Sequence, residues 1–176
     1  EDAPPETRDQ VKKDLLLPIF QGLGTMCNDK RDKIQRKCFE TLVRSYEHVF
    51  LTRSEVIWRA LFKGVLGNIL EDIDFYITGH KQELPDRPKA ITAEILNAMI
   101  GLIAQQSQDR DKFSLLVSLY LELVRDFIVS LPNSILAQTV IDSLNMLREK
   151  TAGKFERQEW DDYVSTFSSL FEQTNP

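Results

Sequence analysis

A basic run at residues 29–37, DKRDKIQRK, offers the clearest chemistry in the sequence. Five of its nine residues are lysine or arginine, against two aspartates. Clustered cations bind acidic proteins or anionic lipid headgroups, and each cation near an anionic membrane contributes about 1 kcal/mol. The alternative is a solvated helix face whose Asp–Lys and Asp–Arg pairs contribute tenths of a kcal/mol each. The candidate binding residues are Lys30, Arg31, Lys33, Arg36 and Lys37.

Side chains that could perform catalysis are scarce. His48 and His80 have no carboxylate or thiol at a useful spacing, and residues 22–24 (GLG) are too short for a phosphate loop. Cys27 and Cys38 are eleven residues apart and fit no metal-ligand pattern, so we expect two buried or half-buried free thiols in a reducing compartment. We therefore predict no enzyme activity, no cofactor and no metal. A small helical enzyme remains an alternative if a deep pocket brings ionisable groups together.

The basic run precedes the strongest apolar pattern of the chain, residues 52–78. Ten apolar residues recur there at steps of three and four, which predicts an α-helix on the order of 40 Å long with a broad apolar stripe. Thr52 and Glu55 have the spacing of a capping box. A stripe that wide needs neighbours on more than one side, so we expect the other helices to pack around it.

The same periodicity predicts six further helices and no strand. Asp29 and Asp109 are predicted N-caps, Pro18 predicts a kink or break, and residues 79–88 form the longest predicted loop. The full set of predicted helices is 10–28, 29–49, 52–78, 89–106, 109–131, 133–150 and 156–173.

Starts near residues 10, 54 and 109 mark three predicted helix pairs, with a lone last helix. Their spacing predicts an all-α fold, a HEAT- or armadillo-like stack of about seven helices. A compact helical bundle is the alternative architecture.

Two sets of apolar residues are predicted to lie inside this stack. The first is the apolar stripe of the first helix, and the second consists of aromatic residues of the third and last helices, for which an exposed docking groove is the alternative. Gly22 and Gly24 would let a neighbouring backbone approach the first helix closely. The two sets are Val11, Leu15, Leu16, Ile19, Phe20, Leu23 and Met26, and Trp58, Phe62, Trp160, Phe167 and Phe171.

The totals fit one globular domain. We predict a single helical-repeat domain at residues 10–176, preceded by an acidic, proline-rich linker remnant at residues 1–9, as in a fragment of a longer protein. The net charge of −5 argues against nucleic acid as the main partner. No run of eighteen apolar residues is present, so no transmembrane helix is predicted.

Three segments, in order, resemble the region downstream of the catalytic exchange domain in large Golgi-associated Arf guanine-nucleotide exchange factors. Residues 47–70 resemble the family's loop and Trp, Leu-Phe, Val-Leu helix, and residues 153–176 its Lys-Phe, Trp and closing Leu-Phe segment. Residues 71–150 match by helical character alone. The first segment carries the resemblance through Pro18, Ile19, Phe20, Gly22, Leu23, Cys27, Asp29, Arg31, Ile34 and Gln35.

The resemblance implies a noncatalytic regulatory module in vesicle trafficking, cytoplasmic and peripheral on Golgi membranes. Implied partners are the GTP form of an Arf-family GTPase, the Golgi membrane surface and other domains of the parent factor, with control of autoinhibition and a homodimer both possible. No segment resembles the exchange motif, so no catalytic residue is carried over. The first segment is closer to the early-Golgi branch and the last to the trans-Golgi branch, which leaves the subfamily open. The alternative is a structural HEAT-like scaffold in another trafficking or assembly factor.

Overall fold

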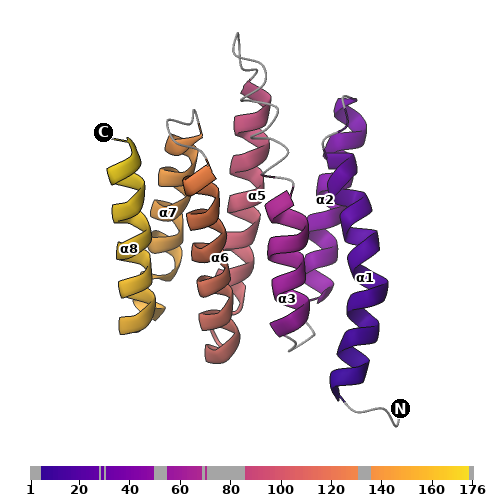
Figure 1. Ribbon diagram of the computed structural model, residues 1–176, viewed down its shortest axis with the longest axis horizontal. Coiled ribbons are helices and arrows are strands. Elements are labelled where there is room, and N and C mark those ends of the chain that lie inside the picture. Colours follow the sequence, from indigo (N-terminus) through magenta and orange to yellow (C-terminus); the bar gives the residue numbers. More distant parts are fainter. Residues whose placement is uncertain are drawn as a thin grey trace. The chain divides into compact units, whose positions relative to one another are not determined.

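The computed structural model describes residues 5–27, 29, 31–49, 55–68, 70, 86–130 and 136–174. In those ranges the elements are helices, seven of them α-helices, and no strand occurs, which confirms the predicted all-α helical stack (Figure 1). The chain divides into two compact units, Glu1–Asp72 and Ile73–Pro176. The single domain expected over residues 10–176 stays a prediction.

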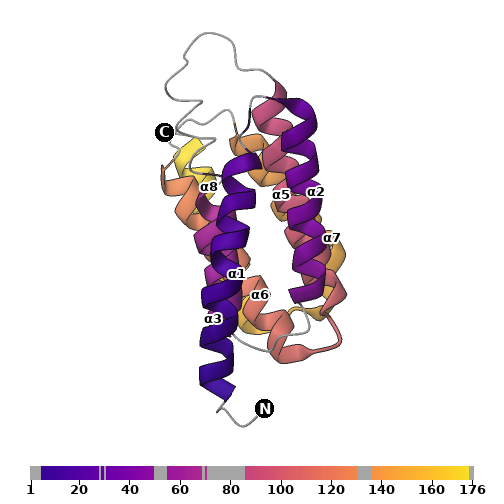
Figure 2. The ribbon, with the colours of Figure 1, turned by 90° about the vertical axis from the view of Figure 1, so that its right-hand side faces the viewer.

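The first unit is built around helix α1 (Pro5–Cys27). Helix α2 (Asp32–Val49) runs back against it in the opposite direction (Figure 2), and α3 (Glu55–Leu61) also packs on it. Phe20 and Cys27 of α1 are buried, as are Cys38 and Leu42 of α2. Helices joined by a short connection pack in this antiparallel way because each buries its apolar side against the other.

Helix α1 departs from its prediction in two respects. It begins at Pro5, five residues before the predicted start, and it continues through Pro18 without a break. Proline removes one backbone hydrogen bond, but Pro18 is exposed, so water can satisfy the carbonyl that loses its donor.

The predicted inward stripe of α1 is wrong for four residues. Val11, Leu15, Ile19 and Met26 are 53%, 66%, 60% and 45% exposed, whereas Phe20 is buried. Leu16 and Leu23 are half-buried. The apolar residues of α1 extend around more of the helix than α2 and α3 cover, so part of them faces solvent.

The stretch predicted as one long α-helix contains a π-helical segment. After α3, residues Phe62–Gly67 form the π-helix η1, which also packs on α1. This segment lies close to α1: a Cβ placed on Gly64 would be in ordinary van der Waals contact with the side chain of Leu17, at 3.8 Å. The side-chain amide of Asn68 donates a hydrogen bond to the Gly64 carbonyl at 3.0 Å and so provides a donor for a carbonyl of the π-helical segment. Thr52 and residues 71–85 lie outside the described residues.

Trp58 and Phe62 confirm the core predicted for this stretch. Trp58 is 1% exposed and Phe62 is fully buried. Their rings meet edge to face at 6.1 Å, a favoured aromatic geometry.

The second unit is a two-layer helix stack. It contains α5 (Asp86–Gln105), α6 (Arg110–Ser130), α7 (Ala137–Thr151), the short η2 (Ala152–Lys154) and α8 (Arg157–Thr174). Helix α5 packs on α7, and α6 packs on α8. Among helices that follow each other in the chain, α5 contacts α6 and α7 contacts α8. The predicted pairing of helix 109–131 with helix 133–150 is therefore wrong, because each of them pairs with its other neighbour in the chain.

The centre of the second unit is α6, whose apolar residues are buried around most of its circumference. Tyr120 is fully buried, and its hydroxyl donates to Ser143 Oγ at 2.8 Å, while Ser143 donates to the Val140 carbonyl at 2.7 Å. At the outer side of α8 the aromatic prediction fails for Phe171, which is 46% exposed. Trp160 and Phe167 are half-buried.

The predicted helix caps differ in outcome. Asp109 caps α6 as predicted, because its Oδ1 accepts the Lys112 amide at 3.3 Å. Asp29 does not occupy the N-cap position of α2. The Arg31 carbonyl accepts the first helical bonds from Ile34 and Gln35, and Asp29 instead accepts the Arg31 amide at 2.8 Å.

A charged cluster joins the start of α6 to the start of α8. Arg110 donates to Glu159 and to the Lys154 carbonyl at 2.9 Å, and its Nε lies 3.0 Å from Glu156 Oε1. The other oxygen of Glu159 accepts the Glu156 amide at 2.9 Å, which is half of a capping box. Burial raises the pKa of Glu159, but the hydrogen bonds from Arg110, Ser114 and backbone amides together lower it by more than burial raises it. The pKa of Glu159 therefore lies below its usual range.

We predict that Glu159→Gln lowers the free energy of unfolding at pH 7 by about 1–3 kcal/mol, because the neutral amide loses the negative charge and keeps one acceptor oxygen where Arg110 and the Glu156 amide each use one. Because the pKa of Glu159 is lower in the folded state, its ionised form stabilises the fold fully at pH values above its unfolded-state pKa of about 4.3. This stabilisation is lost as the pH falls through the lower pKa of the folded state. Urea unfolding of both proteins from pH 7 to pH 2.5 should show the difference shrinking in acid. Asp161→Asn is the control, since that exposed carboxylate should change stability by less than about 0.5 kcal/mol. Equal effects of the two substitutions at pH 7 would contradict the role of Glu159.

Candidate functional site

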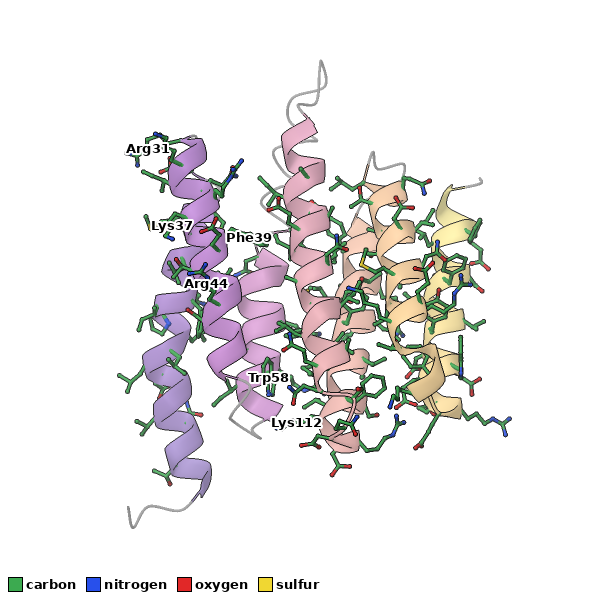
Figure 3. The ribbon with its side chains drawn as sticks, turned by 180° about the vertical axis from the view of Figure 1, so that it is seen from behind. Arg31, Lys37, Phe39, Arg44, Trp58 and Lys112 are labelled. Atoms are coloured by element: carbon green, nitrogen blue, oxygen red, sulfur yellow. The ribbon has the colours of Figure 1, made fainter. Side chains whose placement is uncertain are left out.

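Three of the five predicted basic residues lie on one side of α2. Lys33, Arg36 and Lys37 are exposed, and Arg44 extends the same side by two turns. Positions three, four and seven apart share one helix face, and the opposite face carries the buried Cys38 and Leu42. Figure 3 shows Lys37 and Arg44 on the same side of α2. The four exposed residues are called the cationic face below.

Arg31 is held apart from this face by Asp29. Its guanidinium bonds both carboxylate oxygens, Nε to Oδ1 at 3.0 Å and a terminal nitrogen to Oδ2 at 2.9 Å. The hydrogen bond that Arg31 donates to Asp29, and then the charge of Asp29, raise the pKa of Arg31. Arg31 therefore stabilises the turn before α2, and its positive charge is largely neutralised by Asp29. Lys30 lies outside the described residues.

The cationic face carries little compensating charge of its own. Glu40 lies within it and pairs with Lys37 at 3.4 Å, an exposed contact that contributes little to stability. Lys33, Arg36 and Arg44 form no ion pair with the described residues. Positive charge therefore predominates over about three turns of helix, where phosphate or carboxylate groups can bind without deep burial.

Sequence reasoning left two residues of this surface out of the candidate site. Arg44 lies beyond the continuous run, although its seven-residue step from Lys37 is a signal that finds it. Glu40 occupies the step between them and reduces the net charge. Phe39 is half-buried and lies on a different side of α2 from Lys37 and Arg44, outside the cationic face (Figure 3).

The two cysteines lie on the packed side of α1 and α2, away from the cationic face. Both are free thiols and both are buried, as predicted. Burial, with a smaller contribution from Cys38, raises the pKa of Cys27 to about 12. A thiol with that pKa is almost entirely protonated at neutral pH and is a poor nucleophile.

The part of the chain that the structure describes holds no group of three or more His, Cys, Asp and Glu side chains able to bind a metal ion. The side chain of His48, and His80 as a whole, lie outside that part. None of its helices is long and apolar enough to cross a membrane.

Comparison of the chain with protein-family models, curated proteins and solved structures gives no match. The cationic face therefore has to be interpreted from its own chemistry. That chemistry is electrostatic binding of anionic groups on an extended surface.

We predict that Cys27 resists alkylation in the folded protein. At pH 8 its thiolate fraction is so small that iodoacetamide should modify it at least about 100-fold more slowly than in urea. A Cys38→Ala variant leaves Cys27 as the single thiol and allows its rate to be read by mass spectrometry. A native alkylation rate close to the rate in urea would show that Cys27 is not buried and that its pKa is not raised.

Proposed function

We propose that the chain is a noncatalytic regulatory module of a large Arf guanine-nucleotide exchange factor, and that α2 contributes to its recruitment to Golgi membranes. The observation that carries the proposal is the cationic face of Lys33, Arg36, Lys37 and Arg44. The resemblance of three ordered segments to that family supplies the biological setting. The all-helical stack is compatible with it, because such stacks present extended surfaces to partners.

A membrane surface suits the cationic face better than a small anionic ligand does. The cations are spread along a helix and are not gathered in a pocket, so they can meet many headgroups at once. Weak contacts of this type add up, since each cation contributes about 1 kcal/mol near an anionic leaflet.

We predict that simultaneous Lys33→Glu, Arg36→Glu and Lys37→Glu substitutions weaken binding to anionic vesicles by at least about 100-fold. Flotation with phosphatidylcholine vesicles, with and without phosphatidylinositol 4-phosphate, measures this. The unmodified chain should float with the anionic vesicles alone, and rising salt should weaken the binding because screening shortens the reach of each charge.

The matched control reverses three exposed cations of the second unit, Lys150, Lys154 and Arg157, to glutamate. This variant has the same net charge as the α2 variant, so it tests position separately from total charge. It should retain most of the vesicle binding. Equal loss in both variants would mean that general charge, not the cationic face, governs binding.

A second arm tests the GTPase partner. Immobilised Arf loaded with GTP should retain the chain more strongly than Arf loaded with GDP, measured for both the unmodified chain and the α2 variant. If the chain binds neither vesicles nor Arf, and its α2 variant leaves exchange by the parent factor unchanged, the regulatory proposal is rejected. The alternative, a structural HEAT-like scaffold, predicts that outcome.

A further inference from the structure

Helix α1 carries a line of apolar side chains on its solvent side. Val11, Leu15, Ile19 and Met26 are each 45% or more exposed. Steps of four and seven residues keep them on one side of the helix. These four residues are called the exposed stripe below.

The positions beside the exposed stripe suit an anionic surface. In the sequence, Arg8 and Lys12 stand three residues before two members of the stripe, along one of its borders. On the other border, Asp14 is exposed and accepts a hydrogen bond from the Gln10 amide at 2.8 Å. Apolar residues beside basic positions are typical of helices that lie in the interfacial region of a membrane.

The exposed stripe and the cationic face lie on the same side of the first unit. A Cβ placed on Gly64 of η1 would contact Leu17, and Leu15 lies about 200° around α1 from Leu17. The stripe therefore faces away from η1. Lys37 and Arg44 project from the side of α2 that is turned away from α3 (Figure 3).

The two surfaces also run alongside each other. Because α1 and α2 are antiparallel, residues equally far in sequence from the turn between them lie level with each other (Figure 2). Met26 at the end of α1 is thus level with Lys33 at the start of α2, and Leu15 is level with Arg44. Apolar and cationic residues are presented together over a length on the order of 20 Å.

We infer that the exposed stripe inserts into the interfacial region of an anionic bilayer while the cationic face binds the phosphate groups of its lipids. The inference rests on the proposed function, because the cations of α2 bring α1 to the membrane. A bilayer admits apolar side chains without a complementary partner surface, so binding grows with apolar area and needs no minimum interface. A neutral apolar helix would instead cover cations without supplying opposite charge.

The binding test replaces two members of the stripe, Leu15→Ser with Ile19→Ser. Both side chains are exposed, so the melting temperature should stay close to that of the unmodified chain. Flotation with phosphatidylcholine vesicles that contain phosphatidylinositol 4-phosphate should show binding weakened at least about 10-fold. Salt should remove the remaining binding more readily, because that binding depends on charge alone.

The matched control is Val164→Ser with Phe171→Ser, which replaces two exposed apolar residues of α8. It should leave vesicle binding unchanged. Equal loss in the α1 and α8 variants would overturn the assignment of insertion to α1.

A second measurement detects insertion itself. Phosphatidylcholine with brominated acyl chains quenches the fluorescence of tryptophan that enters the bilayer. Vesicle-bound Leu15→Trp should be quenched beyond the unmodified chain, whose Trp58 and Trp160 give the background. Val164→Trp should be quenched no more than that background.

The outcomes separate this inference from the proposed function. If the α1 serine variant binds like the unmodified chain while the α2 glutamate variant does not, insertion is overturned and the proposed function stands. Bound Leu15→Trp without extra quenching also overturns insertion. A chain that binds neither neutral nor anionic vesicles rejects membrane recruitment and insertion together.

Discussion

The apolar contact between α1 and α2 fixes the orientation of both surfaces of the first unit. A helix is rigid at 3.6 residues per turn, so burying Cys38 and Leu42 turns Lys33, Lys37 and Arg44 toward solvent. Burying Phe20 and Cys27 of α1 likewise leaves its apolar stripe outside. One contact therefore leaves a charged surface on one helix and exposed apolar residues on the other.

The second unit obeys a different constraint, because α6 has neighbours around most of its circumference. Its interior contains a paired polar group in the hydrogen bond from Tyr120 to Ser143. Three other buried polar atoms, Thr92 Oγ1, Arg125 Nε and Tyr163 Oη, have no hydrogen-bond partner among the described residues. At the edge of the core, Arg110 at the start of α6 bonds Glu159 at the start of α8. The cationic face does not belong to this unit.

Periodicity was sufficient to predict the helices and the cationic face. In α2 the apolar positions Ile34, Cys38 and Leu42 occupy one side, so the exposure of Lys33 and Lys37 followed without a structure. It was insufficient for α1 and α8, since a pattern shows which face is apolar but not how many neighbours will cover it. The π-helix at Phe62–Gly67 and the packing of α6 on α8 also depend on tertiary contacts, which no local spacing encodes.

The strength of the cationic face depends on its cations acting together. The face offers four cations offset by Glu40, and exposed charges contribute little when they act singly. Because a helix is rigid, Lys33, Lys37 and Arg44 are held on one side of α2 and can meet an anionic surface at the same time. Their individually small contributions then add, so the face depends on the rigidity of α2 as well as on its charge.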